Sequence, residues 1–489
     1  MRWTKLIGVS VLVGFLSSGA EALGQTATYA DAVAPELREL VPAKAYESRL
    51  ARMQAAASAY LDAKAMSATA ASPCGECLTT FIEAYATDKS VRDALSAVVA
   101  GLHPPPAYAK AANPWSASGT GEELFVQLVS TFTDWCTWLP QIEGDQDDGL
   151  KYIMEFLWLY YRNNAGVAFV QGRNPMDETQ QMPEGFALFN NFAKERGAYM
   201  DSPASTTYVR QWLEDPRIEI EDYQKQRVED YKSWNEFFAR EITIDEATQT
   251  IPSRPVTMPD RDYIISAPTD CIVNPLVQVL VKDGDPHRQF VKSPLNFDMV
   301  LDVKNIPISL SDLLAGVPEK YRAKFVGGSG LSCVLMPNTY HHYHAPVSGT
   351  IVHAAVLDQL GTWGYNDFPN WVPPGGDVGR LGTDFSQFSN FQRGVVIIEV
   401  TYANLPGKSP AKLTGYVASI PVGLDTIGSV VLDDAIKPGA KVKRGYTRLG
   451  NFYYGGSLNI LLFSKGMVSP AVQSRMGNQI GIIDIGSIR

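Results

Sequence analysis

The sequence is poor in cysteine, histidine and positive charge for its length. Five cysteines in 489 residues exclude a small scaffold built from disulfides. Lys and Arg number 42 against 52 Asp and Glu, and the net charge of −10 gives no reason to bind the anionic backbone of nucleic acid, so we expect no nucleic-acid partner. Hydrophobic residues make up 45% of the chain, which excludes a disordered polymer. Three of the six histidines lie together, at His341, His342 and His344.

Long apolar runs are also scarce, and the most prominent one lies at the start of the chain. Residues 1–22 contain Arg2 and Lys5, then an apolar run over residues 6–16, then small residues around Ala22. This order is typical of a secretory signal peptide, and the run is too short to span a bilayer comfortably. We expect cleavage after Ala22 and export to a periplasmic or extracellular compartment. The alternative is an uncleaved anchor that leaves the protein membrane-associated.

Export permits disulfides, and one pair of cysteines is close in sequence. Cys74 and Cys77 are separated by two residues, and we expect a structural disulfide between them. A redox or metal-binding pair is less well supported, because no second such pair and no thioredoxin-like βαβ pattern accompanies it. Cys136, Cys271 and Cys333 lie in apolar surroundings and are interpreted as buried thiols.

Helical periodicity dominates the first half of the chain. Thr120 and Glu123 have the spacing of a capping box, and apolar residues follow at helical spacing until Pro140. A second apolar stripe covers residues 150–161, and we interpret it as the core-facing side of a helix. The alternative is a membrane-docking face made of aromatic side chains. Its members would be Phe156, Trp158, Tyr160 and Tyr161.

The character of the chain changes around residues 249–262, where three prolines lie in a polar stretch. Beyond this point, short β-branched and apolar runs alternate with glycine and proline turns. The expected strands cover residues 272–281, 331–336, 395–402, 413–420, 430–432 and 458–463. The predicted fold class is therefore α+β, with a helical N-terminal domain at 23–248 and a mainly β domain at 249–489.

Residues with catalytic potential stand beside predicted strands of the second domain. Asp270 and the pair His341 and His344 lie close to the starts of two strands, and Ser457 follows two glycines at a third. Together they supply an acid, a base and a nucleophile. Each also has an ordinary structural interpretation, as a capping aspartate, a core histidine or a turn serine. The two histidines have the spacing of half a metal site, but no convincing further ligand is present, so no metal is expected.

Several short motifs follow one another over roughly the second half of the chain. They are Trp234-Asn-Glu-Phe-Phe-Ala-Arg240, Pro268-Thr-Asp270, Tyr340-His341-x-x-His344-x-Pro346, Pro421-Val-Gly423 with Gly428-Ser429, Lys443-Arg-Gly445, and Gly455-Gly-Ser457 followed by Phe463-x-x-Gly466. In order and spacing, this half resembles the phosphatidylserine decarboxylase family, whose members are pyruvoyl-dependent enzymes that cut themselves. The helical half resembles, more faintly, the additional domain of a subset related to tryptophan decarboxylases.

The resemblance implies that the chain is a proenzyme cleaved between Gly456 and Ser457. Ser457 would attack the carbonyl of Gly456 and end as an N-terminal pyruvoyl group. Two chains would result from one precursor, residues 23–456 and residues 457–489.

The resemblance also implies a role for each candidate residue. His344 would take the proton of Ser457, and Asp270 would orient that imidazole. His341 would transfer a proton during decarboxylation. One departure from the family pattern is Leu458, which follows the reactive serine where relatives usually have Ser or Thr. This departure puts efficient cleavage in question and keeps open a second alternative, an unprocessed secreted binding protein.

The implied cofactor is the pyruvoyl group formed from Ser457, with no need for pyridoxal phosphate. It would form a Schiff base with the amine of a substrate whose α-carboxylate then leaves as CO2. Phosphatidylserine is the expected substrate, which places the enzyme in phospholipid biosynthesis. The alternative is a free aromatic L-amino acid such as tryptophan, bound by Trp363, Tyr365, Phe368 and Trp371. The resemblance leaves room for a homo-oligomer and for peripheral contact with a membrane.

Overall fold

The computed structural model shows a mixed α+β chain. The predicted signal peptide at 1–22 and the four aromatic residues at 363–371 lie outside the described residues. The structure describes residues 72–102, 113–141, 152, 155–156, 158–160, 163–174, 177–181, 183–280, 289–291, 295–296, 300–303, 306–357, 392–402, 413–424 and 430–467.

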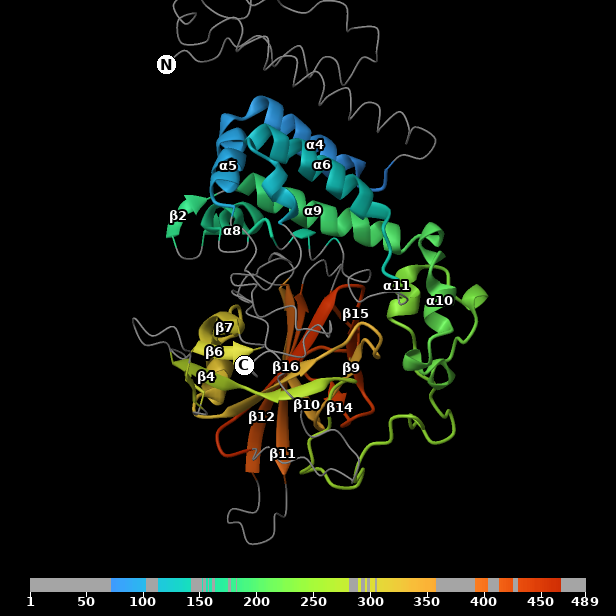
Figure 1. Ribbon diagram of the computed structural model, residues 1–489. Coiled ribbons are helices and arrows are strands. Elements are labelled where there is room, and N and C mark those ends of the chain that lie inside the picture. Colours follow the sequence, from blue (N-terminus) through green and yellow to red (C-terminus); the bar gives the residue numbers. More distant parts are fainter. Residues whose placement is uncertain are drawn as a thin grey trace, which may run out of the picture.

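Helices dominate the first part of the chain and form a layer beside the β-sheets (Figure 1). The α-helices are α4 (Gly75–Thr87), α5 (Lys89–Ala100), α6 (Gly121–Thr137), α8 (Asn164–Gln171), α9 (Pro183–Met200), α10 (Val209–Leu213), α11 (Trp234–Phe238), α12 (Leu310–Leu313) and α13 (Glu319–Arg322). Short 3-10 helices are η3 (Pro114–Ala117), η4 (Pro203–Thr206), η5 (Pro216–Ile218), η6 (Ile220–Asp222), η7 (Val228–Asp230) and η8 (Ala323–Phe325). In the described part of the chain, no helix combines the length and apolar character needed to cross a bilayer.

Strands dominate the second part. They are β1 (Arg173–Asn174), β2 (Asp177–Gln181), β3 (Ile272–Pro275), β4 (Val277–Leu280), β5 (Gln289–Val291), β6 (Val300–Val303), β7 (Ile306–Ser309), β8 (Ser329–Val334), β9 (His342–His344), β10 (Gly349–Leu357), β11 (Arg393–Tyr402), β12 (Leu413–Leu424), β13 (Val430–Leu432), β14 (Lys441–Val442), β15 (Arg448–Phe452) and β16 (Gly456–Phe463). The α+β prediction is confirmed, and every strand expected from the sequence overlaps an observed strand.

The capping box predicted at Thr120 starts α6. The Thr120 hydroxyl accepts a hydrogen bond from the Glu123 N–H (3.2 Å), and the Glu123 carboxylate accepts one from the Thr120 N–H (3.1 Å). Of the four aromatic residues considered as a membrane-docking face, Phe156, Trp158 and Tyr160 are buried and offer no such face. Tyr161 lies outside the described residues, as do residues 150, 153, 154 and 157 of the second apolar stripe.

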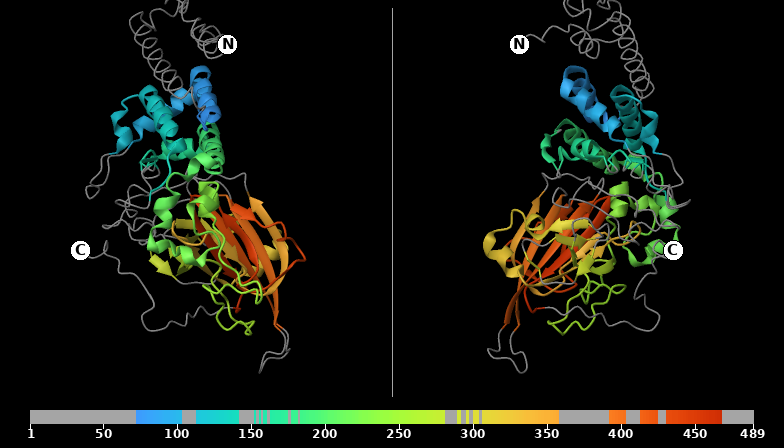
Figure 2. Two further views of the ribbon diagram at one scale, coloured as in Figure 1. Left: turned by 90° about the vertical axis from the view of Figure 1, so that its right-hand side faces the viewer. Right: turned by 60° about the vertical axis from the view of Figure 1, so that its left-hand side comes forward.

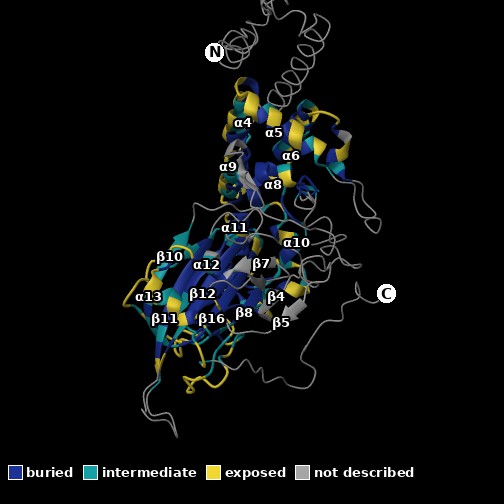
Figure 3. Cartoon of the chain, turned by 90° about the vertical axis from the view of Figure 1, so that its left-hand side faces the viewer, coloured by how far each residue is buried: buried dark blue, intermediate teal, exposed yellow. Residues whose placement is uncertain are grey.

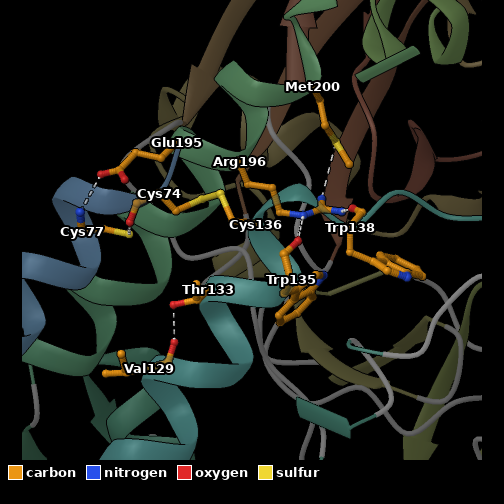
Figure 4. Close-up of a disulfide and its surroundings, with 10 residues drawn as sticks. All are labelled: Cys74, Cys77, Val129, Thr133, Trp135, Cys136, Trp138, Glu195, Arg196 and Met200. Carbon is orange, nitrogen blue, oxygen red and sulfur yellow. Dashed lines mark hydrogen bonds between the residues drawn. A yellow bond between two sulfur atoms is a disulfide. The ribbon is translucent and has the colours of Figure 1, made fainter. Parts of the chain in front are cut away.

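The disulfide prediction is wrong in its pairing. Cys74 bonds to Cys136 near the end of α6, with the two Cα atoms 6.0 Å apart, within the range a disulfide spans (Figure 4). Cys77 is a buried free thiol that donates to the carbonyl of Cys74, while its N–H donates to Glu195. Burial, reinforced by Glu195, raises the pKa of the Cys77 thiol. Packing of α4 against α6, which sequence spacing does not reveal, thus selects the partner.

Arg196 on α9 closes the end of α6. It is buried, and its guanidinium donates to the carbonyls of Trp135 (3.2 Å) and Trp138 (3.0 Å), as Figure 4 shows. A cation suits the carbonyl end of a helix, which carries partial negative charge. The guanidinium also lies over the ring of Tyr454, 5.4 Å from its centroid. Burial lowers the pKa of Arg196 to about 10. The helical layer is thus tied to the segment that precedes Ser457.

The largest sheet has seven antiparallel strands in the order β14-β10-β11-β12-β16-β8-β3. The two views of Figure 2 show the helices of the first part of the chain, coloured blue to green, grouped at one end of this sheet. Figure 3 shows α12 and α13 beside the strands and shows that the central strands are largely buried. Side chains of β16 alternate between two apolar clusters: Leu458 and Ile460 belong to one, Leu461 and Phe463 to the other. The first cluster also contains the core of the helical layer.

Smaller sheets complete the second part. A three-stranded sheet has the order β13-β15-β9, and its Tyr343 and Phe452 side chains join the cluster of Leu461. A four-stranded sheet has the order β5-β4-β6-β7, and β1 pairs with β2 in the helical part. The three-stranded sheet matters for the site because the histidine motif forms its edge strand, β9.

Candidate active site

The large sheet brings the segments of Asp270 and Ser457 to the same edge. Val334 of β8 pairs with Ile272 of β3 on one side and with Leu458 of β16 on the other. These three residues form one row across the sheet, so Ile272 and Leu458 are about 10 Å apart at two strand spacings. Asp270 precedes this row by two residues and Ser457 by one. The register therefore places both candidates at the same end of the two strands that flank β8.

The histidine motif joins the same edge through the loop that carries Asp270. The hydroxyl of Thr269 donates to the carbonyl of Tyr340 (2.9 Å), and the N–H of His344 donates to the carbonyl of Pro268 (2.7 Å). The sequence predicts that the histidines precede a strand, whereas in the structure His342–His344 itself forms the short strand β9. The structure thus puts the backbone of Asp270 and that of His344 in adjacent segments.

His344 is buried, and one of its ring nitrogens is unpartnered. Its Nε2 lies 3.0 Å from the hydroxyl of Tyr340, while Nδ1 has no hydrogen-bond partner among the described residues. Burial lowers the pKa of His344 to about 4, and the charges of His342 and Arg448 act in the same direction. At neutral pH the ring is therefore uncharged and able to accept a proton.

His341 occupies a different environment from His344. Its Nδ1 lies 2.8 Å from the carbonyl of Thr339, and its ring packs on Phe238 with the centroids 3.8 Å apart. Burial, and then the positive charge of Arg240, lowers the pKa of His341 to about 3. Because alternate residues of an extended segment point to opposite sides, the two histidines do not share a face.

His342 lies on the same side as His344, stacked on Tyr340 with ring centroids 5.0 Å apart. Its Nε2 lies 2.8 Å from the carbonyl of Ala239. These contacts hold the histidine strand against the segment after α11 and support a structural role for His342.

The carboxylate of Asp270 is held by Arg254. The Arg254 Nε lies 3.0 Å from both carboxylate oxygens of Asp270, and its Nη2 donates to one of them at 2.9 Å. The same guanidinium pairs with Asp222 and Glu219. Bonds to these carboxylates raise the pKa of Arg254, against the effect of its burial. Arg254, which the sequence analysis did not single out, fixes the position of Asp270.

Ser457 is the second residue of β16 and is 2% exposed. Its hydroxyl has no hydrogen-bond partner among the described residues, whereas its carbonyl accepts a hydrogen bond from the N–H of Leu335 (3.1 Å). Gly455, two residues earlier, has a φ of 150°, a conformation that a side chain disfavours. Leu458 points to the opposite face, so its departure from the family pattern takes no hydroxyl from the face of Ser457.

The largely buried motif at residues 234–240 is hydrogen-bonded to two segments of the site. Arg240 is buried and donates to the carbonyls of Asn338 (2.7 Å) and Thr339 (3.3 Å), directly before the histidines. Asn235 accepts a hydrogen bond from the N–H of Tyr454 (3.1 Å), three residues before Ser457. From the sequence this motif is recognised as part of a family pattern. The sequence does not reveal that the motif bonds to the segment before the histidines and to the segment before Ser457.

This arrangement fits a serine that is converted in place. The buried, unpartnered hydroxyl of Ser457 lies on β16 two residues after a glycine with a φ of 150°, and the uncharged His344 lies on β9 beside the loop of Asp270. Among the described residues, no hydrogen bond joins the side chains of Asp270, His344 and Ser457 to one another. The pyruvoyl group that the family implies would form from Ser457, and these residues fit it. Among the described residues, no group of three or more His, Cys, Asp and Glu side chains has the arrangement of a metal site.

Comparisons with known proteins agree with this arrangement. The family model described as phosphatidylserine decarboxylase matches residues 234–482, about half of the chain. A phosphatidylserine decarboxylase proenzyme of Clostridium perfringens is 24% identical over 324 residues, which cover 66% of this chain and 86% of the relative.

Two fungal relatives match this chain over a smaller part of its length. Phosphatidylserine decarboxylase proenzyme 2 of Komagataella phaffii is 23% identical over 277 residues, 56% of this chain but 22% of the relative's length. The decarboxylase iboD of Amanita muscaria is 26% identical over 233 residues, 48% of this chain and 58% of the relative. The matched residues contain every candidate site residue, and the chain belongs to the phosphatidylserine decarboxylase family of carboxy-lyases.

Proposed function

We propose that this protein is a self-processing, pyruvoyl-dependent decarboxylase that cleaves itself between Gly456 and Ser457. The observation that carries the proposal is the buried, unpartnered hydroxyl of Ser457, close behind a glycine with a φ of 150°. A hydroxyl in this condition is ready to attack the preceding carbonyl. Cleavage of the exported precursor gives the chains 23–456 and 457–489.

The pyruvoyl group supplies a carbonyl that condenses with a substrate amine and draws electrons from the bond to the departing carboxylate. The N–H of Leu335, which bonds to the carbonyl oxygen of Ser457, stabilises negative charge that develops on that oxygen. His344 accepts the serine proton, because its low pKa keeps it uncharged at neutral pH. Asp270, held by Arg254, orients the His344 imidazole, and His341 takes part in proton transfer during decarboxylation.

Two substrates fit this chemistry, and we place phosphatidylserine first. The relative from Clostridium perfringens, which this chain matches over most of its length, is named for that lipid. A free aromatic L-amino acid such as tryptophan is the second candidate. The relative from Amanita muscaria supports it, because a decarboxylase not named for the lipid shares this catalytic region.

For the part of the chain that precedes the catalytic domain, we propose two roles from its sequence. Residues 1–22 direct export to a periplasmic or extracellular compartment, where the protein is soluble or peripherally bound to a membrane. Residues 23–248 form a helical domain of the kind found before the catalytic part in relatives of tryptophan decarboxylases. The boundary after residue 248 is placed at the start of the proline-rich stretch at 249–262.

Release of CO2 tests the proposal and separates the substrates. The purified full chain is incubated with vesicles containing phosphatidylserine and, separately, with free L-tryptophan, and the Ser457→Ala variant serves as the blank for both. CO2 from the vesicles alone supports the lipid substrate, and CO2 from tryptophan alone supports the amino acid. An intact chain that releases CO2 from neither contradicts the proposal and favours a binding protein.

A further inference from the structure

Asn459 follows Ser457 by two residues on β16 and lies on the same face of the sheet. The two faces of the sheet pack against different apolar clusters: Leu458 and Ile460 belong to one cluster and Leu461 to the other. Since side chains alternate along a strand, Ser457 and Asn459 share the face of Leu461. Two residues of a strand span about 7 Å, so the amide of Asn459 lies within reach of a molecule attached at residue 457.

The side chain of Asn459 is fully buried, and only part of it has a partner. Its Oδ1 accepts a hydrogen bond from the hydroxyl of Ser419 (3.1 Å). Its Nδ2 has no partner among the described residues, and neither has the hydroxyl of Ser457. Buried polar groups in folded proteins are nearly always paired, because an unpaired donor has lost its water without compensation. Two unpaired groups on one face beside the reactive residue indicate a site that a ligand completes.

We infer that Nδ2 of Asn459 donates a hydrogen bond to the α-carboxylate of the bound substrate, an inference that rests on the proposed decarboxylase function. The buried neighbours on this face are uncharged: Cys333, Leu335 and Leu461. A neutral donor orients the carboxylate in these surroundings without pairing it with a full positive charge. Less stabilisation of the carboxylate is therefore lost when it leaves as CO2. Ser419 fixes the amide by its bond to Oδ1.

Binding of ligands that cannot react tests this inference without an activity assay. N-acetyl-L-tryptophan and vesicles of N-acetylphosphatidylserine keep the carboxylate but have no amine to condense. N-acetyl-L-tryptophanamide and vesicles of N-acetylphosphatidylethanolamine lack the carboxylate. Dissociation constants are measured for the processed wild type, for Asn459→Leu, which keeps the volume, and for Asn459→Asp, which repels a carboxylate. Ser332→Ala is the matched control, because Ser332 is also fully buried and unpartnered but faces the other side of the sheet.

In one of the two ligand pairs, the tryptophan pair or the phospholipid pair, the wild type is expected to bind the ligand with the carboxylate more tightly than the ligand without it. Asn459→Leu is expected to reduce that preference by about tenfold to a hundredfold, Asn459→Asp to abolish it, and Ser332→Ala to leave it unchanged. If Asn459→Leu or Asn459→Asp does not fold, the binding preference of the other variant tests the inference. A wild type without preference, or a preference kept in Asn459→Leu, would overturn the inference. Failure of the proposed function is distinguishable, because the wild-type chain would then be found uncut by mass spectrometry.

Discussion

Ser457 and His344 are both buried, and the hydroxyl of Ser457 has no hydrogen-bond partner among the described residues. Replacing Ser457 by Ala removes the attacking hydroxyl, and we expect a single uncut chain on a denaturing gel. The Ser332→Ala variant loses a buried hydroxyl from the opposite face and should be cut as the wild type is. Cleavage after Gly456 in Ser457→Ala would show that another group is the nucleophile.

Arg254 is expected to affect self-cleavage by holding the carboxylate of Asp270 in place. The Arg254→Gln variant loses the charge-assisted hydrogen bonds to the Asp270 carboxylate, each worth about 1.5–3 kcal/mol, so self-cleavage should slow by about tenfold or more. The rate is measured from the decay of uncut precursor after synthesis. Arg261→Gln is the control, because Arg261 has an exposed contact with Tyr263. Equal rates in both variants would argue against a positioning role for Arg254.

The two buried histidines make stability depend on pH. The pKa of His341 is lowered to about 3 and that of His344 to about 4, both mainly by burial. The unfolded chain takes up these protons near pH 6.5, before the folded chain does, so stability is full above pH 6.5 and declines as pH falls toward 4. Each histidine contributes a slope of up to about 1.4 kcal/mol per pH unit in this window.

Thermal unfolding measured between pH 7.5 and 4.5 checks this dependence. In His341→Gln, one titrating group is gone, and the decline in melting temperature should be correspondingly shallower than in the wild type. Identical pH profiles for the two proteins would contradict the buried, uncharged state of His341.

At the scale of elements, the Cys74–Cys136 disulfide joins α4 to α6 across 62 residues of sequence. A bridge over a loop of this length stabilises a folded chain by about 2–4 kcal/mol. The Cys74→Ser variant should lose that stability in chemical denaturation, while Cys77→Ser, at the free thiol, should lose less. A peptide map without reduction identifies the pairing directly, and a Cys74–Cys77 peptide would contradict the structure.

The same helices show what the sequence predicts well and what it does not. The start of α6 follows from Thr120 and Glu123, because a capping box uses only contacts within a few residues. The strands followed from alternating apolar runs bounded by turns. The disulfide partner of Cys74, and the bonds of Arg254 and Arg240, depend on segments far apart in sequence. No local pattern encodes these contacts, so the candidate residues were predicted while their supports were not.

At the scale of the whole molecule, the helical layer and the catalytic sheet share one apolar cluster. Arg196 adds a second connection, because it closes α6 and lies over Tyr454, close to the cleavage site. Replacing Arg196 by Met leaves the carbonyls of Trp135 and Trp138 without this donor, which should cost about 1–3 kcal/mol. Thermal unfolding measures the loss, and Lys194→Met, an exposed change on the same helix, should show almost none. Equal melting temperatures in the two variants would contradict the account of this connection.

The account as a whole depends on the conversion of Ser457, and the mass of the purified protein tests that most directly. Intact mass spectrometry under denaturing conditions should find a small fragment covering residues 457–489, with an N-terminal pyruvoyl group in place of serine. The complementary fragment should end at Gly456. A chain that retains residues 456 and 457 in one piece, with an ordinary serine at 457, would contradict the account.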